Sequence, residues 1–155
     1  MKAGWFVLLC VLLASACSRG SGGNPMMPSG LQAMMTGKWT INTVTLYYFD
    51  STGAPFGAGK FIDTVPSGYY YQFNNNNTWT EILADSLSVN GIGGTWSTAD
   101  DSSFTLMNPA AAEPVPCHMD TLTAGIFVFY HERGTHFNGV TPGYIRYRFH
   151  MTRGN

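Results

Sequence analysis

The strongest constraint on the fold is a two-residue alternation near the C-terminus, in the segment YIRYRFHMT at residues 144–152. Every second position is apolar or aromatic, and the positions between are mostly polar or basic. The apolar set consists of Ile145, Tyr147, Phe149 and Met151. Successive side chains of a β-strand point to opposite faces of the sheet. The pattern therefore predicts a strand with one buried face and one wet face.

Seven further segments rich in aromatic or β-branched residues precede this one, and turn residues separate them. They span residues 38–49, 69–73, 78–84, 91–98, 102–108, 117–123 and 126–132. Only residues 29–37 predict a helix, of one or two turns. Short strands at this spacing are typical of an all-β sandwich or barrel. Because closing an up-and-down meander removes its exposed edges, we expect an eight-stranded antiparallel β-barrel over residues 31–155.

The first of these segments shows a slip in its apolar phase. Trp39 and Ile41 share one parity, whereas the apolar positions that follow have the other parity: Val44, Leu46 and Tyr48. A slip of one residue moves side chains to the other face of a sheet, so we predict a bulge near residues 42–43.

The N-terminus has the three-part pattern of a secretory signal peptide over residues 1–16. Lys2 supplies the positive charge, residues 5–13 are apolar, and three small residues follow. The apolar run is too short to span a bilayer, which needs ~20 helical residues. The next residue is Cys17, and the segment resembles a bacterial lipobox, whose cysteine receives a diacylglycerol. Ala14 stands where that motif usually has Leu, and secretion with cleavage nearby is the alternative.

The cysteine count agrees with lipidation. Of the three cysteines, Cys10 leaves with the signal peptide. If Cys17 carries lipid, Cys117 has no cysteine partner in the mature chain. Without the lipid, a Cys17–Cys117 disulfide is allowed in an oxidising compartment. Residues 17–30 are rich in Gly, Ser and Pro and predict a flexible tether between lipid and domain.

Five segments together resemble a lipocalin-like lipoprotein domain of the Bacteroidetes type: LQAMMTGKWTI, YYYQFNNNNTWTEI, GGTWS, MDTLTAGIFVFY and GYIRYRFHMTR. The resemblance covers about residues 31–153. It implies a β-barrel that can enclose an apolar cavity. It also implies that an arginine of the last strand packs over Trp39 of the Gly-x-Trp motif, with Arg146 and Arg148 as candidates. Residues 18–30 lack the acidic signal associated with surface export in these bacteria. We therefore expect a cell-envelope protein anchored to the outer membrane and facing the periplasm.

Aromatic side chains are the candidate ligand site. An apolar pocket with a few polar groups is the usual place for a small ligand. We expect a small apolar or amphipathic molecule in a cavity lined by Tyr71, Trp96 and Phe149. The wider predicted lining is Trp39, Tyr69, Tyr71, Phe73, Trp96, Phe104, Tyr147 and Phe149. The alternative is that these rings simply fill a small barrel.

The connection over residues 50–68 exceeds the usual length of a loop in a compact domain. In a lipocalin-like barrel it lies over the mouth, so we predict an apolar lid formed by Phe56, Phe61 and Ile62. The alternatives are a surface loop without a role, or an extra edge strand at residues 59–65.

Several function classes are disfavoured. The formal net charge is −1 and no basic run occurs, which argues against nucleic acid as a partner. The histidines of HERGTH are five residues apart, whereas zinc peptidases place two four apart on a helix, so we expect no metal and no cofactor. Cys117 and His118 point to opposite faces of a strand, and we expect no enzyme. The main prediction is a monomeric binding module; the alternative is a pocketless interaction domain of the cell envelope.

Overall fold

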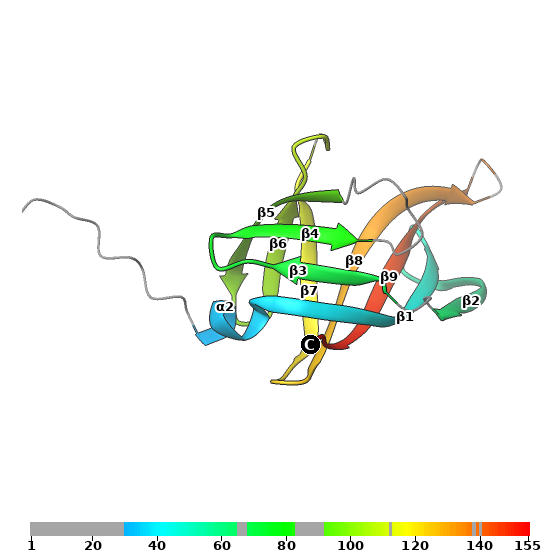
Figure 1. The fold of residues 1–155 in the computed structure, drawn as a ribbon. Coiled ribbons are helices and arrows are strands. Elements are labelled where there is room, and N and C mark those ends of the chain that lie inside the picture. The colour runs from blue at the N-terminus through cyan, green and yellow to red at the C-terminus, as the bar shows by residue number, and fades with distance from the viewer. Residues whose placement is uncertain (1–29, 65–67, 83–91, 112, 138, 140) are drawn as a thin grey trace, which may run out of the picture.

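The computed structural model describes residues 30–64, 68–82, 92–111, 113–137, 139 and 141–155. In this part of the chain, antiparallel strands form one sheet, eight of them close into a barrel, and one short helix precedes them (Figure 1). The all-β, eight-stranded barrel predicted from the alternation is therefore confirmed. The predicted signal peptide, Cys17 and the tether up to residue 29 lie outside the described residues. No helix among the described residues is long and apolar enough to cross a membrane.

The elements follow one another along the chain as a meander. They are α2 (Gly30–Met35), β1 (Gly37–Asp50), β2 (Pro55–Thr64), β3 (Tyr70–Phe73), β4 (Thr78–Ile82), β5 (Ile92–Asp100), β6 (Ser103–Met107), β7 (Val115–Leu122), β8 (Ile126–Phe137) and β9 (Thr141–Arg153). The eight predicted strands correspond to β1 and to β3 through β9. The strands β3 to β9 pair in sequence, and β9 returns to pair with β1, which closes the barrel.

The bulge in β1 is confirmed. The register against β9 shifts between Ile41 and Thr43, so Val44 returns to the buried side of the sheet. The turn after β3 consists of asparagines at residues 74–77, a residue type that tolerates the left-handed backbone conformation. Asn77 adopts that conformation, with a φ of 62°. On β5, a Cβ at Gly94 would lie 1.8 Å from the carbonyl oxygen of Met107, so the close approach of these strands requires glycine.

The segment over residues 50–68 forms a strand. Here β2 pairs with the second half of β1, from Thr43 opposite Thr64 to Phe49 opposite Pro55. The first half of β1 pairs on the same edge with the short strand β3. Of the alternatives for this segment, the extra strand is the one the structure shows, and it begins four residues earlier than predicted. Residues 65–67 lie outside the described residues.

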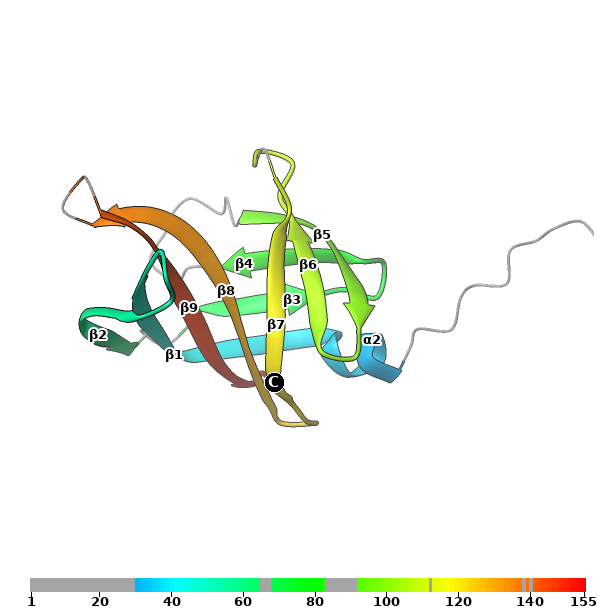
Figure 2. The ribbon, with the colours of Figure 1, turned by 180° about the vertical axis from the view of Figure 1, so that it is seen from behind.

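The two ends of the barrel consequently differ, and both are visible in Figures 1 and 2. At the end nearest α2, called here the closed end, the helix lies beside the start of β1. At the other end, β1, β8 and β9 run on beyond the short strands β3 and β4, and β2 is added to β1. This second region is called the extended end.

The closed end is filled with apolar side chains. Trp39, Phe73 and Phe127 have no exposed surface, and Met35 of α2 is buried with them. The Trp39 and Phe127 rings meet edge to face with centroids 5.4 Å apart. The Trp39 Nε1–H donates to the Met35 carbonyl at 2.7 Å, so its one polar atom is satisfied. This packing makes the closed end a core rather than a pocket.

The arginine over Trp39 is Arg153, and the prediction of Arg146 or Arg148 is wrong. The Arg153 guanidinium lies 4.4 Å from the Trp39 ring, and its Nη1 donates to the Thr36 carbonyl at 2.8 Å. The register explains the difference. In antiparallel pairing the start of β1 faces the end of β9, so Trp39 is opposite Arg153.

Candidate functional site

The predicted lining residues lie mostly within the packed core. Tyr69 and Tyr147 are half-buried, whereas the other six are buried: Trp39, Tyr71, Phe73, Trp96, Phe104 and Phe149. Phe73 alone meets four rings at centroid distances of 5.5 to 6.0 Å. Tyr71, Trp96 and Phe149 line neither of the two cavities described below. The alternative in which rings fill the barrel thus describes the closed end.

The predicted lid residues all belong to β2. The backbones of Phe61 and Ile62 pair with Leu46 and Thr45 of β1. The ring of Phe56 stacks on Phe137 of β8, with centroids 4.2 Å apart and planes within 10°. Phe137 also meets Tyr48 at 6.0 Å. This aromatic cluster joins β2 to the far end of β8 at the extended end.

Polar side chains replace aromatic ones where the core meets the extended end. Glu81 is the cross-strand partner of Tyr71, and the Tyr71 hydroxyl donates to its carboxylate. Burial raises the pKa of the Glu81 carboxyl. The pKa of Tyr71 is raised well above its usual value by burial and, to a smaller degree, by the negative charge of Glu81. These two groups form a hydrogen-bonded pair with little access to water.

His131 of β8 is a second polar residue near this pair, because its ring contacts Phe149, which also meets Tyr71. Its ring stacks on Tyr147 and Phe149, with centroids 5.2 and 5.7 Å away. Its Nδ1 is buried and has no hydrogen-bond partner in the described part of the chain, and the same holds for Trp79 Nε1. Burial, followed by the positive charge of Arg133, lowers the pKa of His131. The ring is therefore neutral at pH 7 and has a polar atom free for a ligand or a water molecule.

Cys117 faces His131 across the pairing of β7 and β8. The thiol is free, its side chain is 1% exposed, and burial raises its pKa to about 12. Its neighbour His118 is exposed and stacks on Tyr130 at 5.1 Å. A buried thiol of this kind is a poor nucleophile, since the reactive species is the thiolate.

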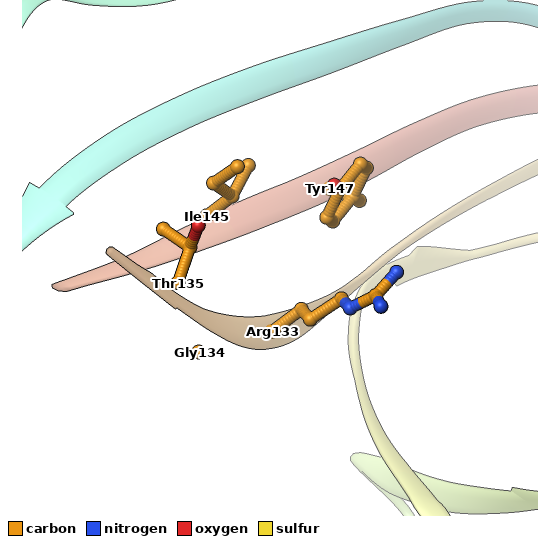
Figure 3. A pocket seen from close by; sticks show the side chains of 5 residues that line it. All are labelled: Arg133, Gly134, Thr135, Ile145 and Tyr147. Atoms are coloured by element: carbon orange, nitrogen blue, oxygen red, sulfur yellow. The ribbon is translucent and has the colours of Figure 1, made fainter. Parts of the chain in front are cut away.

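At the extended end, the described residues line two cavities. The smaller, of about 250 Å³, is lined by Arg133, Gly134, Thr135, Ile145 and Tyr147. Figure 3 shows Arg133 and Thr135 on one strand and Ile145 and Tyr147 on its neighbour. The larger, of about 550 Å³, lies against the connection before β7 and is lined by Ala111, Glu113, Pro114, Val115, Pro116, His131, Glu132, Arg133 and Gly134. The two linings share Arg133 and Gly134.

These features assign the candidate site to the extended end. Of the predicted lining residues, Tyr147 belongs to it directly. Within the described residues, no group of three or more His, Cys, Asp or Glu side chains could hold a metal ion. The groups on offer are aromatic faces, a neutral imidazole and an arginine, which suit binding of an organic molecule.

Glu81 and His131 are not among the predicted lining residues, although strand parity points to both. Glu81 is two residues after the buried Trp79, and His131 is two residues after the buried Phe129. Alternate residues of a strand share one face, so both side chains face the barrel interior. Polar residues at such positions are the signal that would have identified the site.

Comparison with known proteins adds no family assignment. No protein-family model matches the chain, and no curated protein matches it significantly.

Proposed function

We propose that this protein is a membrane-anchored, lipocalin-like lipoprotein that binds a small apolar or amphipathic molecule at the extended end of its barrel. The observation that carries the proposal is the cavity of about 250 Å³ bordered by Ile145 and Tyr147. It lies beside a core that protein side chains already fill, so the core needs no ligand to complete its packing. A packed base beneath a partly polar cavity suits orientation of an amphipathic molecule.

The binding proposal is tested by titration with N-phenyl-1-naphthylamine, an uncharged apolar dye that fluoresces when it leaves water. The wild-type protein should enhance the fluorescence in a saturable way. Ile145→Asp places a charge in the cavity wall and should weaken binding by at least about tenfold. Ile126→Asp is the matched control, because Ile126 is 41% exposed on the adjacent strand. Equal binding by both variants, at equal thermal stability, would reject this site.

The anchor proposal rests on Cys17 and on the position of Cys117. Cys117 is buried inside the barrel, which argues against its pairing with a cysteine of the N-terminal segment. Cys17 is then available for lipid, and we place the protein on the periplasmic side of the outer membrane. In cells given labelled palmitate, the wild type and Cys117→Ala should incorporate label, and Cys17→Ala should not. Label retained by Cys17→Ala would contradict the anchor.

A second candidate function is an interaction domain of the cell envelope, and the outer face of the sheet favours it. Phe49 and Tyr144 stack at 4.9 Å, and the Arg146 guanidinium lies over Phe49 and Tyr130 at 5.2 and 4.4 Å. Mixed aromatic and arginine surfaces are common at protein interfaces. A photocrosslinking residue at Tyr144 should form a discrete adduct with an envelope protein, and one at the exposed Met107 should not. The absence of an adduct at both positions would contradict the interaction function and leave ligand binding as the proposed function.

A further inference from the structure

We propose that the molecule bound at the extended end carries an oxyanion headgroup, a carboxylate or a phosphate, which Arg133 binds. The proposal rests on the proposed binding function and names the chemistry of its ligand.

Arg133 differs from the other arginines of the described chain in having no protein partner there. Arg146 forms a salt bridge with Glu132 at 2.7 Å, and Arg148 forms one with Asp120 at 2.6 Å. Arg153 is held by Trp39 and by backbone carbonyls. Within the described residues, Arg133 makes neither a salt bridge nor a side-chain hydrogen bond, yet it lines both cavities. Its donors are free to bind a planar oxyanion.

The two strands that border the smaller cavity carry complementary rows of side chains. On β8, His131, Arg133 and Thr135 alternate and therefore share a face. On β9, Tyr147 lies opposite His131, and Ile145 lies opposite Arg133. One row offers polar and charged groups, and the other offers an aromatic ring and an aliphatic chain. An amphipathic molecule can place its head on the β8 row and its chain on the β9 row.

The charge distribution favours an anion. The lining of the smaller cavity contains Arg133 as its charged side chain and no acidic one. Glu132 is directed to the other face of β8, where Arg146 binds it. The larger cavity has two acidic residues in its lining, Glu113 and Glu132, and the Glu132 carboxylate is paired with Arg146. His131 also lines the larger cavity, and its buried Nδ1 has no hydrogen-bond partner among the described residues.

The test compares compounds that share a ten-carbon chain, by displacement of the bound naphthylamine dye at constant salt. Decanoate and decyl phosphate carry the oxyanion, decanol has the chain without the charge, and acetate has the charge without the chain. The wild type should bind decanoate or decyl phosphate at least about tenfold more tightly than decanol, as a charge-assisted hydrogen bond in a partly enclosed site would give. Acetate should not displace the dye.

Variants assign that preference to Arg133. Arg133→Gln should lose the preference, so that decanoate and decyl phosphate bind no more tightly than decanol, and Arg133→Lys should retain part of it. Arg148→Gln removes the same charge from the outer face and should behave like the wild type. Equal affinity for decanol and both anions in the wild type, or an unchanged preference in Arg133→Gln, would overturn the headgroup proposal alone. Failure of the dye itself to bind would overturn the proposed function.

Discussion

The closed end and the extended end are made by the same strands and differ in what those strands place inside. On β8, Phe127 and Phe129 are fully buried among rings, whereas His131, Arg133 and Thr135 follow on the same face and border cavities. One strand therefore contributes to stability at one end and, in the proposed function, to binding at the other. Because the two tasks are separated along the barrel axis, substitutions at the extended end should change binding with little effect on folding.

Strand length produces this separation. Four residues of β3 and five of β4 cover the closed end, while β1, β8 and β9 have 14, 12 and 13 residues. Where β3 ends, the edge of β1 is taken by β2. Among the described residues, β3 and β4 do not continue alongside the later parts of β1, β8 and β9. Cavities and polar groups are consequently found there.

The largest expected effect concerns Cys117, which lies where the two regions meet. Raising a thiol pKa from 9.0 to about 12 lowers the thiolate fraction at pH 8 by about a thousandfold. With Cys10 and Cys17 replaced by alanine, native protein should react with iodoacetamide at least about a thousandfold more slowly than unfolded protein. A cysteine at the exposed Thr121 of the same strand, in a Cys117→Ala background, is the control. Rapid labelling of native Cys117 would contradict the burial of its thiol.

The same substitution at the two ends of β8 compares their packing directly. Phe127→Ala removes a ring with no exposed surface and should lower the free energy of unfolding by about 3–5 kcal/mol. Phe137→Ala removes a half-buried ring that pairs with Phe56 and Tyr48 at the extended end, and should cost about 1–3 kcal/mol, the value of two aromatic pairs. Urea denaturation measures both. Equal losses would show that the extended end is part of the core.

Arg153 and Arg148 provide a smaller comparison on β9. Arg153→Ala removes the contact with Trp39 and the hydrogen bond to Thr36, and should cost about 1–2 kcal/mol. Arg148→Ala removes a partly exposed ion pair with Asp120 and should cost less than about 1 kcal/mol. Thermal unfolding at low and high salt distinguishes them, because screening weakens the second. A larger loss for Arg148→Ala would contradict the role given to Arg153.

The smallest expected effect is a pH dependence from His131. Its pKa is lowered in the folded protein, so between that pKa and 6.5 the unfolded chain binds more protons. Stability should therefore rise with pH through this window and fall as pH drops below 6.5. His131→Gln should reduce the slope, and the exposed His136→Gln should not. Both variants retain Glu81, whose raised pKa gives stability that falls with rising pH. An unchanged dependence of stability on pH in His131→Gln would indicate that His131 is exposed to water in the folded protein.

Much of the barrel could be predicted because parity is a local property. The bulge in β1, the eight barrel strands and the helix before them all follow from residues within a few positions of one another. The ends of β8 and β9 are longer than predicted because Gly134, Pro142 and Gly143 suggest turns. Pairing between the two strands continues through these residues. Hydrogen bonds supplied by a neighbouring strand outweigh local preference there.

Features that depend on long-range register could not be predicted in the same way. Which arginine covers Trp39 depends on how β9 aligns with β1, which no short segment reveals. The same holds for the cavities, since they depend on how far the described parts of β3 and β4 extend along the longer strands. Glu81 and His131 are an intermediate case. The sequence shows that each shares a strand face with a buried aromatic residue, but it does not show that this end of the barrel is polar.

The pairing of β1 with β9 has a consequence for folding. It joins parts of the chain as distant as Asn42 and Thr152, whose side chains hydrogen-bond across 110 residues. Contacts of such sequence separation are slow to form, because the intervening loop must lose its entropy first. Until β9 is available, β1 lacks its longest partner and the barrel has two free edges. The chain thus remains an open meander until its last strand has been made, and barrel closure is the step where folding and misassembly compete.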